Sequence, residues 1–440
     1  MSINFSFLDE LPNEWKKARV KNILDYNHHY PIGDGDHGSI KPEMYQDDGI
    51  PYLRVQNLTW GFNINYDNLV YISDEVNQAN SKSILMPNDI LIAKTGATVG
   101  KMAIIPESMK QANTTSSVGK ITINQKIFNN LYFAYLFSSP MFQEQIKEKA
   151  YQKSAQPGFN IDDLIEFNII IPPRDIQNKI ANHLDKETTK IDLTIAKNEE
   201  LIKLLSEKRV ALINQVVTKG LNPDVPMKDS GDEWIGEIPK HWKIDCLKHN
   251  IILNALTLTD TTDSNYEFDY VDIGSVSLEK GIEKYEHMIF EDSPSRARRI
   301  VKKDDVIIST VRTYLKAIAI IPDKENIIVS TGFAVLTPTN INSRYLGYMV
   351  KSEYFTNLVS AYSVGVSYPA INSTDLINLD IVIPPDDEQK QIADYLDKEI
   401  SNINNIINNV SHNINLLEEY KTSLIHHVVT GKIDVRGEEI

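Results

Sequence analysis

The sequence predicts an α/β (α+β) tandem repeat, in which two α/β domains alternate with two long helices that pair as an antiparallel coiled coil. Two observations predict this fold class. A 50-residue stretch occurs twice, at 169–218 and 381–430, with a constant offset and 23 identical positions. The segments before the two copies carry short alternating strand patterns, turn-rich loops and a helical stretch. We therefore expect two similar halves related by a pseudo-two-fold axis.

Each copy of the repeat places apolar residues at alternating steps of four and three, which puts one residue per turn on a single seam. In the first copy the seam consists of Ile191, Ile195, Ile202, Leu205, Leu212 and Val216, with Asn198 and Arg209 at the intervening steps. In the second copy it consists of Ile403, Ile407, Ile414, Leu417, Leu424 and Val428, with Val410 and Lys421 between them. The sequence does not fix the direction of pairing, but a pseudo-two-fold requires antiparallel helices. Two ordinary core helices are the alternative, and strict heptads over this length disfavour it.

The repeat divides the chain into four segments. We assign 1–167 to the first α/β domain, 168–221 to the first helical region, 222–379 to a connector and the second α/β domain, and 380–440 to the second helical region. The two α/β domains correspond in several places. The sequence LPNEWK at Leu11 matches IPKHWK at Ile238, residues 88–106 match 304–322, and the tyrosines at 132 and 135 match those at 345 and 348.

Composition limits the class of protein. A chain of 440 residues favours two or three domains over a single core. The net charge of −15 does not favour a nucleic-acid partner, although binding requires only a local basic face. Cys246 is the single cysteine, which excludes a disulfide framework. We see neither a secretory signal nor an apolar run of membrane-spanning length, and we expect a cytoplasmic protein.

Three sequence phrases resemble one known family. PMKDSGDEWIGEIPKHW, IPP followed by Gln177 or by Glu388-Gln389, and GDGDHG followed by GIPYLRVQNL are similar to the specificity subunits of type I restriction-modification enzymes. The resemblance covers essentially the whole chain. Ile176 departs from the family's pattern, which usually has Glu at this position of PPxxEQ.

The resemblance implies two variable target-recognition domains and two conserved helical regions. These regions would dock two methyltransferase (modification) subunits and, through them, restriction subunits. The resemblance also implies that S-adenosylmethionine, ATP and Mg belong to the partner subunits and that this chain carries no cofactor. We expect further apolar helix positions to remain for docking, such as Ile180, Leu204, Ile213 and Val217.

The sequence lacks a recognisable catalytic set. It contains no methyltransferase loop of the Asn/Asp-Pro-Pro-aromatic type, no Walker A loop and no GxGxxG, HExxH or GxSxG. The GDGDHG loop superficially resembles a metal loop, but it lacks the spacing and the terminal Glu of a calcium site. We interpret its Asp34 and His37 as part of a turn that faces DNA.

Candidate DNA-binding residues gather in loops of both α/β domains. Arg54, Gln56 and Asn57 follow a strand and carry side chains suited to base edges. A turn between two strands offers small, polar and basic side chains that suit phosphate contact. In the first domain these are Lys94, Thr95, Thr98 and Lys101, and in the second Arg312, Thr313, Tyr314 and Lys316. We add Gln156 and Tyr368 from later loops, and the basic cluster Arg296, Arg298, Arg299, Lys302 and Lys303, for which a solvated charged face is the alternative.

These features together predict a non-catalytic DNA-recognition and assembly subunit that reads a bipartite, asymmetric DNA site. The diverged loops of the two α/β domains favour two different half-sites on one scaffold. A coiled-coil scaffold without base readout is the alternative. A stand-alone DNA methyltransferase or nuclease is disfavoured because its motifs are missing.

Overall fold

The computed structural model describes residues 11–28, 30–152 and 157–437. The chain folds into two compact units. Unit 1 comprises Met1–Lys197 and His412–Ile440, and unit 2 comprises Asn198–Ser411. Each unit therefore contains one α/β domain together with part of both long helices. Among the described residues, no helix is both long and apolar enough to span a membrane.

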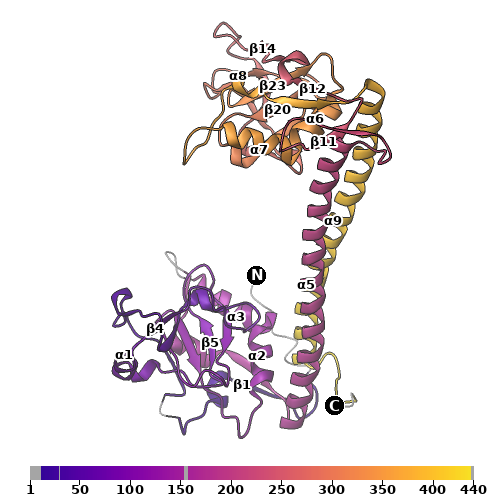
Figure 1. The fold of residues 1–440 in the computed structure, drawn as a ribbon. Coiled ribbons are helices and arrows are strands. Elements are labelled where there is room, and N and C mark those ends of the chain that lie inside the picture. The colour runs from indigo at the N-terminus through magenta and orange to yellow at the C-terminus, as the bar shows by residue number, and fades with distance from the viewer. Residues whose placement is uncertain (1–10, 29, 153–156, 438–440) are drawn as a thin grey trace. The chain divides into compact units, whose positions relative to one another are not determined.

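Unit 1 is built on three small sheets (Figure 1). The antiparallel pair is β1 (Lys16–Arg19) with β9 (Asn168–Ile171). The four-stranded sheet has the order β2 (Ile32–Asp34), β8 (Val118–Ile121), β5 (Ile90–Ala93), β6 (Met102–Ile104). The three-stranded sheet has the order β4 (Val70–Ile72), β3 (Ile50–Leu53), β7 (Asn113–Thr114). The short helices are α1 (Asp74–Ala79), α2 (Asn130–Ser138), α3 (Pro140–Ala150) and α4 (Ile161–Glu166).

The main core of unit 1 lies around α2. This helix is apolar on nearly every side, as expected for a helix that is covered all round. Phe133 and Phe137 are fully buried and belong to a cluster that also contains Ile92 of β5, Ile180 of the first long helix and Val428 of the second. The domain and both helices of unit 1 thus share one core.

Unit 2 repeats this plan with more strands. The antiparallel pairs are β10 (Met227–Asp229) with β11 (Glu237–Pro239), β12 (Lys243–Cys246) with β24 (Asp380–Ile383), and β16 (Val276–Ser277) with β17 (Gly281–Ile282). A four-stranded sheet has the order β13 (Ile251–Leu253), β23 (Phe333–Pro338), β20 (Val306–Ser309), β21 (Ile318–Ile320). A five-stranded sheet has the order β14 (Leu256–Thr257), β19 (Ala297–Ile300), β22 (Ile327–Ser330), β15 (Glu267–Val271), β18 (Glu286–Ile289). The short helices are α6 (Ser343–Lys351), α7 (Glu353–Tyr362) and α8 (Ser373–Leu376).

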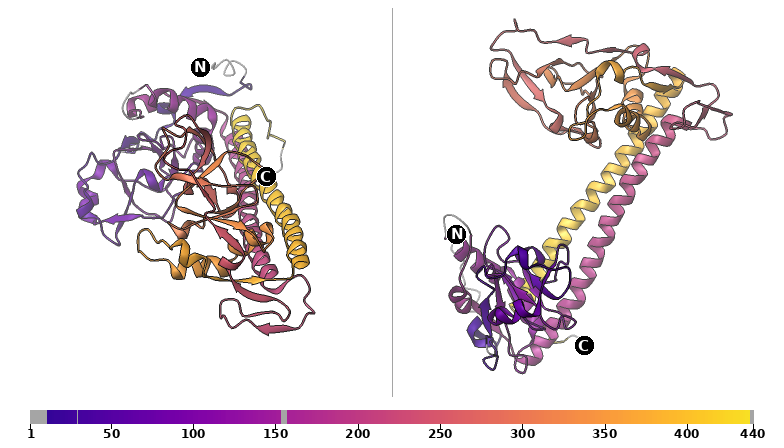
Figure 2. Two further views of the ribbon diagram at one scale, coloured as in Figure 1. Left: turned by 90° about the horizontal axis from the view of Figure 1, so that it is seen from above. Right: turned by 60° about the vertical axis from the view of Figure 1, so that its left-hand side comes forward.

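The long helices α5 (Arg174–Lys219) and α9 (Asp386–Val429) run side by side, as Figures 1 and 2 show. In unit 1, Nζ of Lys421 lies 2.6 and 2.7 Å from the two carboxylate oxygens of Asp192. In unit 2, Arg209 Nη1 donates to Asn404 Oδ1 at 2.9 Å. Moving forward along α5 therefore means moving back along α9, which confirms the predicted antiparallel pairing. Each residue of the two predicted seams is buried or half-buried.

The two helices begin alike. In each unit a glutamine one turn into the helix donates to the carbonyl of the first proline of the Pro-Pro pair and accepts the backbone N–H of an asparagine. Gln177 contacts Pro172 at 2.8 Å and Asn129 at 2.9 Å; Gln389 contacts Pro384 at 2.9 Å and Asn342 at 2.7 Å. The same two asparagine side chains cap α2 and α6. The glutamine of the PPxxEQ phrase thus joins each long helix to its domain.

The two units also share a buried tyrosine with equivalent partners. The hydroxyl of Tyr132 donates to the carbonyls of Ile170 and Val429, at 3.0 and 3.4 Å. The hydroxyl of Tyr345 donates to those of Val382 and Val217, at 2.8 and 3.3 Å. Because these partners correspond in the 212-residue repeat, the contacts give an alignment of the two units that does not depend on the diverged loops.

Candidate nucleic-acid interface

Two loops meet at the same place in each α/β domain. In unit 1 the loop after β5 bridges the loop before α4, where Thr95 pairs with Gly158 and Phe159 N donates to Lys94 O at 3.1 Å. In unit 2 the loop after β20 bridges the loop after α7. There Val311 pairs with Ala370. These two loop pairs are the candidate interface, because the same scaffold presents different side chains in the two copies.

Lys94 is not available for phosphate contact, contrary to the sequence prediction. Its ammonium group pairs with the carboxylate of Asp34, and the residue is only 6% exposed. Asp34 also accepts from the exposed His37 at 3.1 Å. A buried lysine whose charge is already paired has neither the reach nor the free charge to bind DNA.

The rest of the GDGDHG loop stabilises its own turn. The buried carboxylate of Asp36 accepts the backbone N–H groups of Gly38 and Ile40, at 3.0 and 2.7 Å, and the hydroxyl of Tyr52. Burial and the neighbouring Asp36 carboxylate raise the pKa of Tyr52 well above its ordinary value. A Cβ at Gly35 would lie 2.0 Å from the Thr114 carbonyl oxygen, so only glycine fits there. Within the described residues, no group of three His, Cys, Asp or Glu side chains could hold a metal ion.

The proposed base-reading triad of the first domain is reduced to one residue. Asn57 is fully buried, and its side chain bonds to the backbone of Arg54 and Asn65. Arg54 is half-buried and donates to the Asn68 carbonyl at 2.6 Å. Gln56 alone is exposed. The sequence at the end of a strand cannot reveal which of three neighbouring polar side chains points outward.

The neighbouring turn of the first domain keeps three of its candidates at the surface. Thr95, Thr98 and Lys101 are half-buried. Gln156 lies outside the described residues.

The basic cluster of the second domain does not form one cationic face. Strand β19 directs neighbouring side chains to opposite faces of its sheet. Arg298 packs its guanidinium 4.7 Å from the centre of the Phe290 ring, while Arg299 donates to Thr257 Oγ1 at 3.1 Å. Burial lowers the pKa of Arg299.

The outer members of that cluster have acidic partners. Arg296 lies 3.3 Å from Asp272, and Lys303 lies 2.6 Å from Asp323, which raises the pKa of the lysine. Lys302 is exposed. The count of five cations in eight residues therefore overstates the charge that the surface offers to DNA.

The Arg312 loop is the most exposed part of the candidate interface. Arg312 and Lys316 both adopt left-handed backbone conformations, at φ 51° and 48°. The Arg312 guanidinium lies 5.3 Å from the centre of the Tyr368 ring, and both residues are exposed. Tyr314 is exposed, whereas Thr313 is buried and its hydroxyl lies 2.9 Å from that of Ser363. Thr313 therefore joins the two loops and is not free to read bases.

Sequence reasoning missed two residues of this loop pair. Val364 and Val366 are 80% and 101% exposed, beside Tyr368. Apolar side chains that are exposed together, and not singly, are typical of a surface that contacts a partner. The run SVGVSYP, with Gly365 at φ 111°, was the available signal, since it places apolar residues in a turn.

Most of the predicted docking positions on the helices are not available either. Ile180 and Val217 are buried in the cores of units 1 and 2, and Ile213 is half-buried against the second core. Leu204 is 54% exposed. The repeat pattern shows which positions are apolar, but it does not show which of them the α/β domains cover.

Comparisons with known proteins identify the family. The profile of the type I restriction modification DNA specificity domain matches residues 12–203 and 250–416. The chain belongs to this family. It is a DNA-recognition subunit and not a catalytic one, as predicted.

Relatives and solved structures extend over nearly the whole chain. The type I restriction enzyme MjaVIII specificity subunit of Methanocaldococcus jannaschii is 23% identical over 97% of this chain and 95% of its own length. The type I restriction enzyme StySPI specificity subunit of Salmonella potsdam is 24% identical over 84% of this chain and 81% of its own length. A chain of a type I R-M system, solved to explain complex assembly and conformational transition, superposes with a TM-score of 0.73 at 15% identity, over 96% of this chain and 99% of that one. The HsdS subunit of Thermoanaerobacter tengcongensis superposes with a TM-score of 0.54 at 15% identity, over 96% of this chain and 98% of that one.

Proposed function

We propose that this specificity subunit reads a bipartite, asymmetric DNA site, one part with the loop pair of each domain. The observation that carries the proposal is the repeated loop pair. The bridges Thr95–Gly158 and Val311–Ala370 occupy equivalent places, yet the side chains around them differ. One scaffold with two sets of side chains suits two half-sites of different sequence.

Individual roles follow from exposure. In the second domain, Arg312 can donate two hydrogen bonds to guanine, and Tyr314 and Tyr368 can pack against the DNA beside it. In the first domain, Lys101 of the loop pair suits a phosphate, while Gln56, which follows β3 outside the loop pair, suits adenine. The complex acts on the DNA of its host, so we place it in the cytoplasm.

We also propose that the helices dock two methyltransferase subunits and, through them, restriction subunits. In unit 2, Leu201, Leu204 and Ile406 are 40%, 54% and 45% exposed. Each of them directly precedes a seam residue, namely Ile202, Leu205 and Ile407. Because the two helices are antiparallel, positions that precede the seam lie on the same side of the pair in both helices. Exposed leucine and isoleucine along one side of a helix pair suit a protein partner.

The test is a map of methylated adenines in cells that express this chain with a methyltransferase subunit. We expect one bipartite motif with a fixed spacer. Gln56→Ala should relax positions in one half only, and Arg312→Ala positions in the other half only. A continuous motif, or one substitution that alters both halves, would contradict the proposal.

A biochemical control separates recognition from catalysis. The purified chain without its partner should bind DNA but transfer no labelled methyl group. Methyl transfer by this chain alone would show that it is an enzyme.

A further inference from the structure

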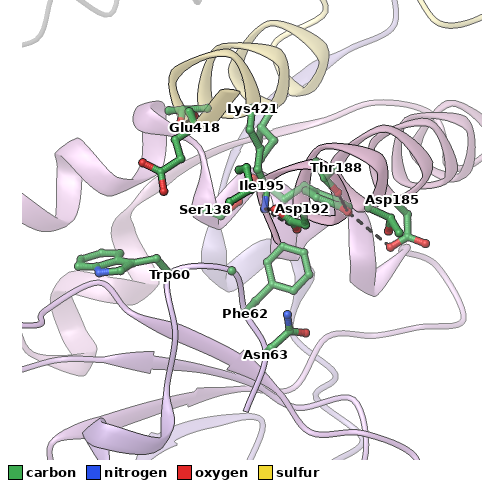
Figure 3. A pocket seen from close by; sticks show the side chains of 15 residues that line it. Trp60, Phe62, Asn63, Ser138, Asp185, Thr188, Asp192, Ile195, Glu418 and Lys421 are labelled. Atoms are coloured by element: carbon green, nitrogen blue, oxygen red, sulfur yellow. Dashed lines mark hydrogen bonds and ion pairs between the residues drawn. The ribbon is translucent and has the colours of Figure 1, made fainter. Parts of the chain in front are cut away.

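Unit 1 contains a cavity of about 460 Å³ between its α/β domain and its own part of the helix pair (Figure 3). Trp60 and Ser138 line the domain side. Asp185 and Asp192 line it from α5, and Glu418 from α9. Trp60 is 58% exposed, which is high for the largest side chain in a folded protein.

The charges around this cavity do not balance. Lys421 contacts both carboxylate oxygens of Asp192 and neutralises that residue. Within the described part of the chain, Asp185 accepts a hydrogen bond only from the hydroxyl of Tyr135, at 3.5 Å. Across 11–28, 30–152 and 157–437, no lysine, arginine or histidine pairs with Asp185 or with Glu418. The cavity therefore retains an excess of two negative charges.

In unit 2, the carboxylate that is equivalent to Asp185 pairs with an arginine. Asp397 corresponds to Asp185 in the repeat, and it accepts the hydroxyl of Tyr348 at 2.8 Å. Its other oxygen accepts from Arg344 Nη1 at 2.6 Å, while Nη2 of the same guanidinium lies 2.7 Å from Asp394. The tyrosine alignment puts Leu131 of unit 1 at the position of Arg344. Unit 1 thus keeps the aspartate but lacks the arginine.

A second cation is also missing from unit 1. The same alignment matches Ser138 with Lys351, the last residue of α6. Burial and the nearby Arg209 lower the pKa of Lys351 to about 8, while Glu279 favours its charged form. Unit 2 therefore places two cations of its own, Arg344 and Lys351, where unit 1 has an apolar residue, a serine and a cavity.

We propose that the cavity of unit 1 binds arginine side chains from a basic segment of a protein partner. One guanidinium takes the place on Asp185 that Arg344 takes on Asp397. A second lies at the opposite side, where Figure 3 shows Glu418 directed toward Trp60, and stacks on the indole ring. Guanidinium suits both places because it pairs with carboxylates through two N–H groups and also packs on aromatic faces.

The proposal is tested on the full chain with the peptide acetyl-Gly-Arg-Gly-Arg-Gly-amide and the same peptide carrying citrulline, which keeps the shape and removes the charge. The chain has four tryptophans, so its indole N–H signals are few, and Trp60→Phe identifies that of Trp60. We expect the arginine peptide to shift this signal saturably and the citrulline peptide to leave it unchanged. A third peptide, with lysine in place of both arginines, should bind several-fold more weakly.

Matched variants locate the binding. Asp185→Asn and Glu418→Gln change exposed residues, and each should weaken binding about threefold to tenfold. Ser138→Lys supplies the cation of unit 2 and should abolish binding. Lys186→Gln, an exposed change on α5 that does not line the cavity, should bind at least as tightly as the wild type.

Three results would overturn the proposal: no saturable shift, equal shifts with citrulline, or wild-type binding by Asp185→Asn, Glu418→Gln and Ser138→Lys. A lysine peptide that binds as tightly as arginine would overturn the assignment to guanidinium. Neither probe nor readout involves DNA, so these outcomes are independent of the proposed reading of a bipartite site.

Discussion

At the scale of single residues, surroundings decide what a charged side chain can do. Arg298 and Arg312 are the same residue type in the same domain, but Arg298 packs on Phe290 within its own sheet while Arg312 lies on an exposed loop. Lys94 is committed to Asp34. Only a basic side chain that is exposed and unpaired can contribute its full charge to DNA binding.

We predict that Arg312→Ala costs about 1–3 kcal/mol of cognate DNA binding and relaxes one position of the site. The reason is the loss of two hydrogen bonds to a base. Binding to unrelated DNA should change little. Arg298→Ala is the matched control, because it removes the same charge and should leave the sequence preference unchanged. Gel-shift titrations on cognate and substituted duplexes measure both. An equal loss on all sequences would instead make Arg312 a phosphate contact.

The pH dependence of stability should report on Lys351. Its pKa is about 8 in the folded protein against 10.5 for an ordinary lysine. Between these values the unfolded chain binds the proton and the folded chain does not, so stability rises with pH. The loss of stability caused by burying the charged Lys351 side chain is fully present below pH 8 and disappears above pH 10.5. We expect Lys351→Met to lack this rise, which can reach about 1.4 kcal/mol per pH unit.

Urea unfolding at several pH values between 7.5 and 10.5 measures the effect as the difference between the wild type and Lys351→Met. Taking the difference removes the contributions of other groups that titrate in this range. A difference that stays constant with pH would mean that Lys351 has an ordinary pKa.

At the scale of elements, the start of each long helix is fixed by polar contacts to its domain. The glutamines Gln177 and Gln389 make equivalent contacts, but the preceding residues differ. Glu388 accepts the indole N–H of the buried Trp242 at 2.9 Å and lies 2.6 Å from His241. Ile176 holds the corresponding place in unit 1, where it is half-buried and lines a small pocket together with the half-buried Trp15. The departure from the PPxxEQ phrase thus puts an apolar side chain where unit 2 has a polar contact.

We predict that Glu388→Ile destabilises the protein by about 1–3 kcal/mol, because it leaves the buried indole N–H of Trp242 without an acceptor. Glu388→Gln keeps an oxygen at that position and should cost less. Thermal or urea unfolding of the two variants provides the comparison. If they were equally stable, the hydrogen bond would not contribute.

Docking on the helices can be tested without disturbing the fold. Changing Leu204 and Ile406 to Asp places charges on an exposed apolar surface, so we expect the methyltransferase subunits to be lost while the far-ultraviolet circular dichroism stays unchanged. Size-exclusion chromatography of the co-expressed subunits measures assembly. Ile213→Asp would be unsuitable, since Ile213 packs against the core of unit 2. An intact complex with both substitutions would refute docking on this surface.

At the scale of the whole molecule, the two helices join the two units, so their length should set the spacer of the DNA site. The pairs Asp192–Lys421 and Arg209–Asn404 define one register, in which residues 197–203 face 410–416. Deleting both of these seven-residue stretches, 197–203 and 410–416, keeps the two seams in phase and shortens each helix by about 10 Å. We expect the unread spacer to shrink by about three base pairs, at about 3.4 Å per base pair, while both half-site sequences stay the same.

Methylated-adenine mapping reads out this deletion directly. Removing only 197–203 is the control, because it leaves the facing heptad of α9 unpaired and should destabilise the helix pair. An active double deletion that still methylates sites with the original spacing would show that the helices do not measure the DNA. A change in either half-site sequence would show that they influence base readout.

The sequence alone determined the repeat, the heptad seams and the family, because these properties depend on period and local pattern. A 3.5-residue repeat predicts a coiled coil whatever the rest of the fold is, and the glutamine after Pro-Pro is recognisable without coordinates. The sequence could also predict that the loops of the α/β domains carry the recognition residues, since the two copies differ most there.

Only the tertiary structure decided which side chains of those loops and helices are free. Asn57 and Lys94 are polar and lie in the predicted loops, yet packing and an ion pair with Asp34 remove them from the surface. Ile180 and Val217 follow the helical pattern, yet the cores of units 1 and 2 cover them. Exposure depends on contacts between residues far apart in sequence, such as Lys94 with Asp34 or Tyr132 of α2 with Val429 of α9, and no local pattern encodes those contacts.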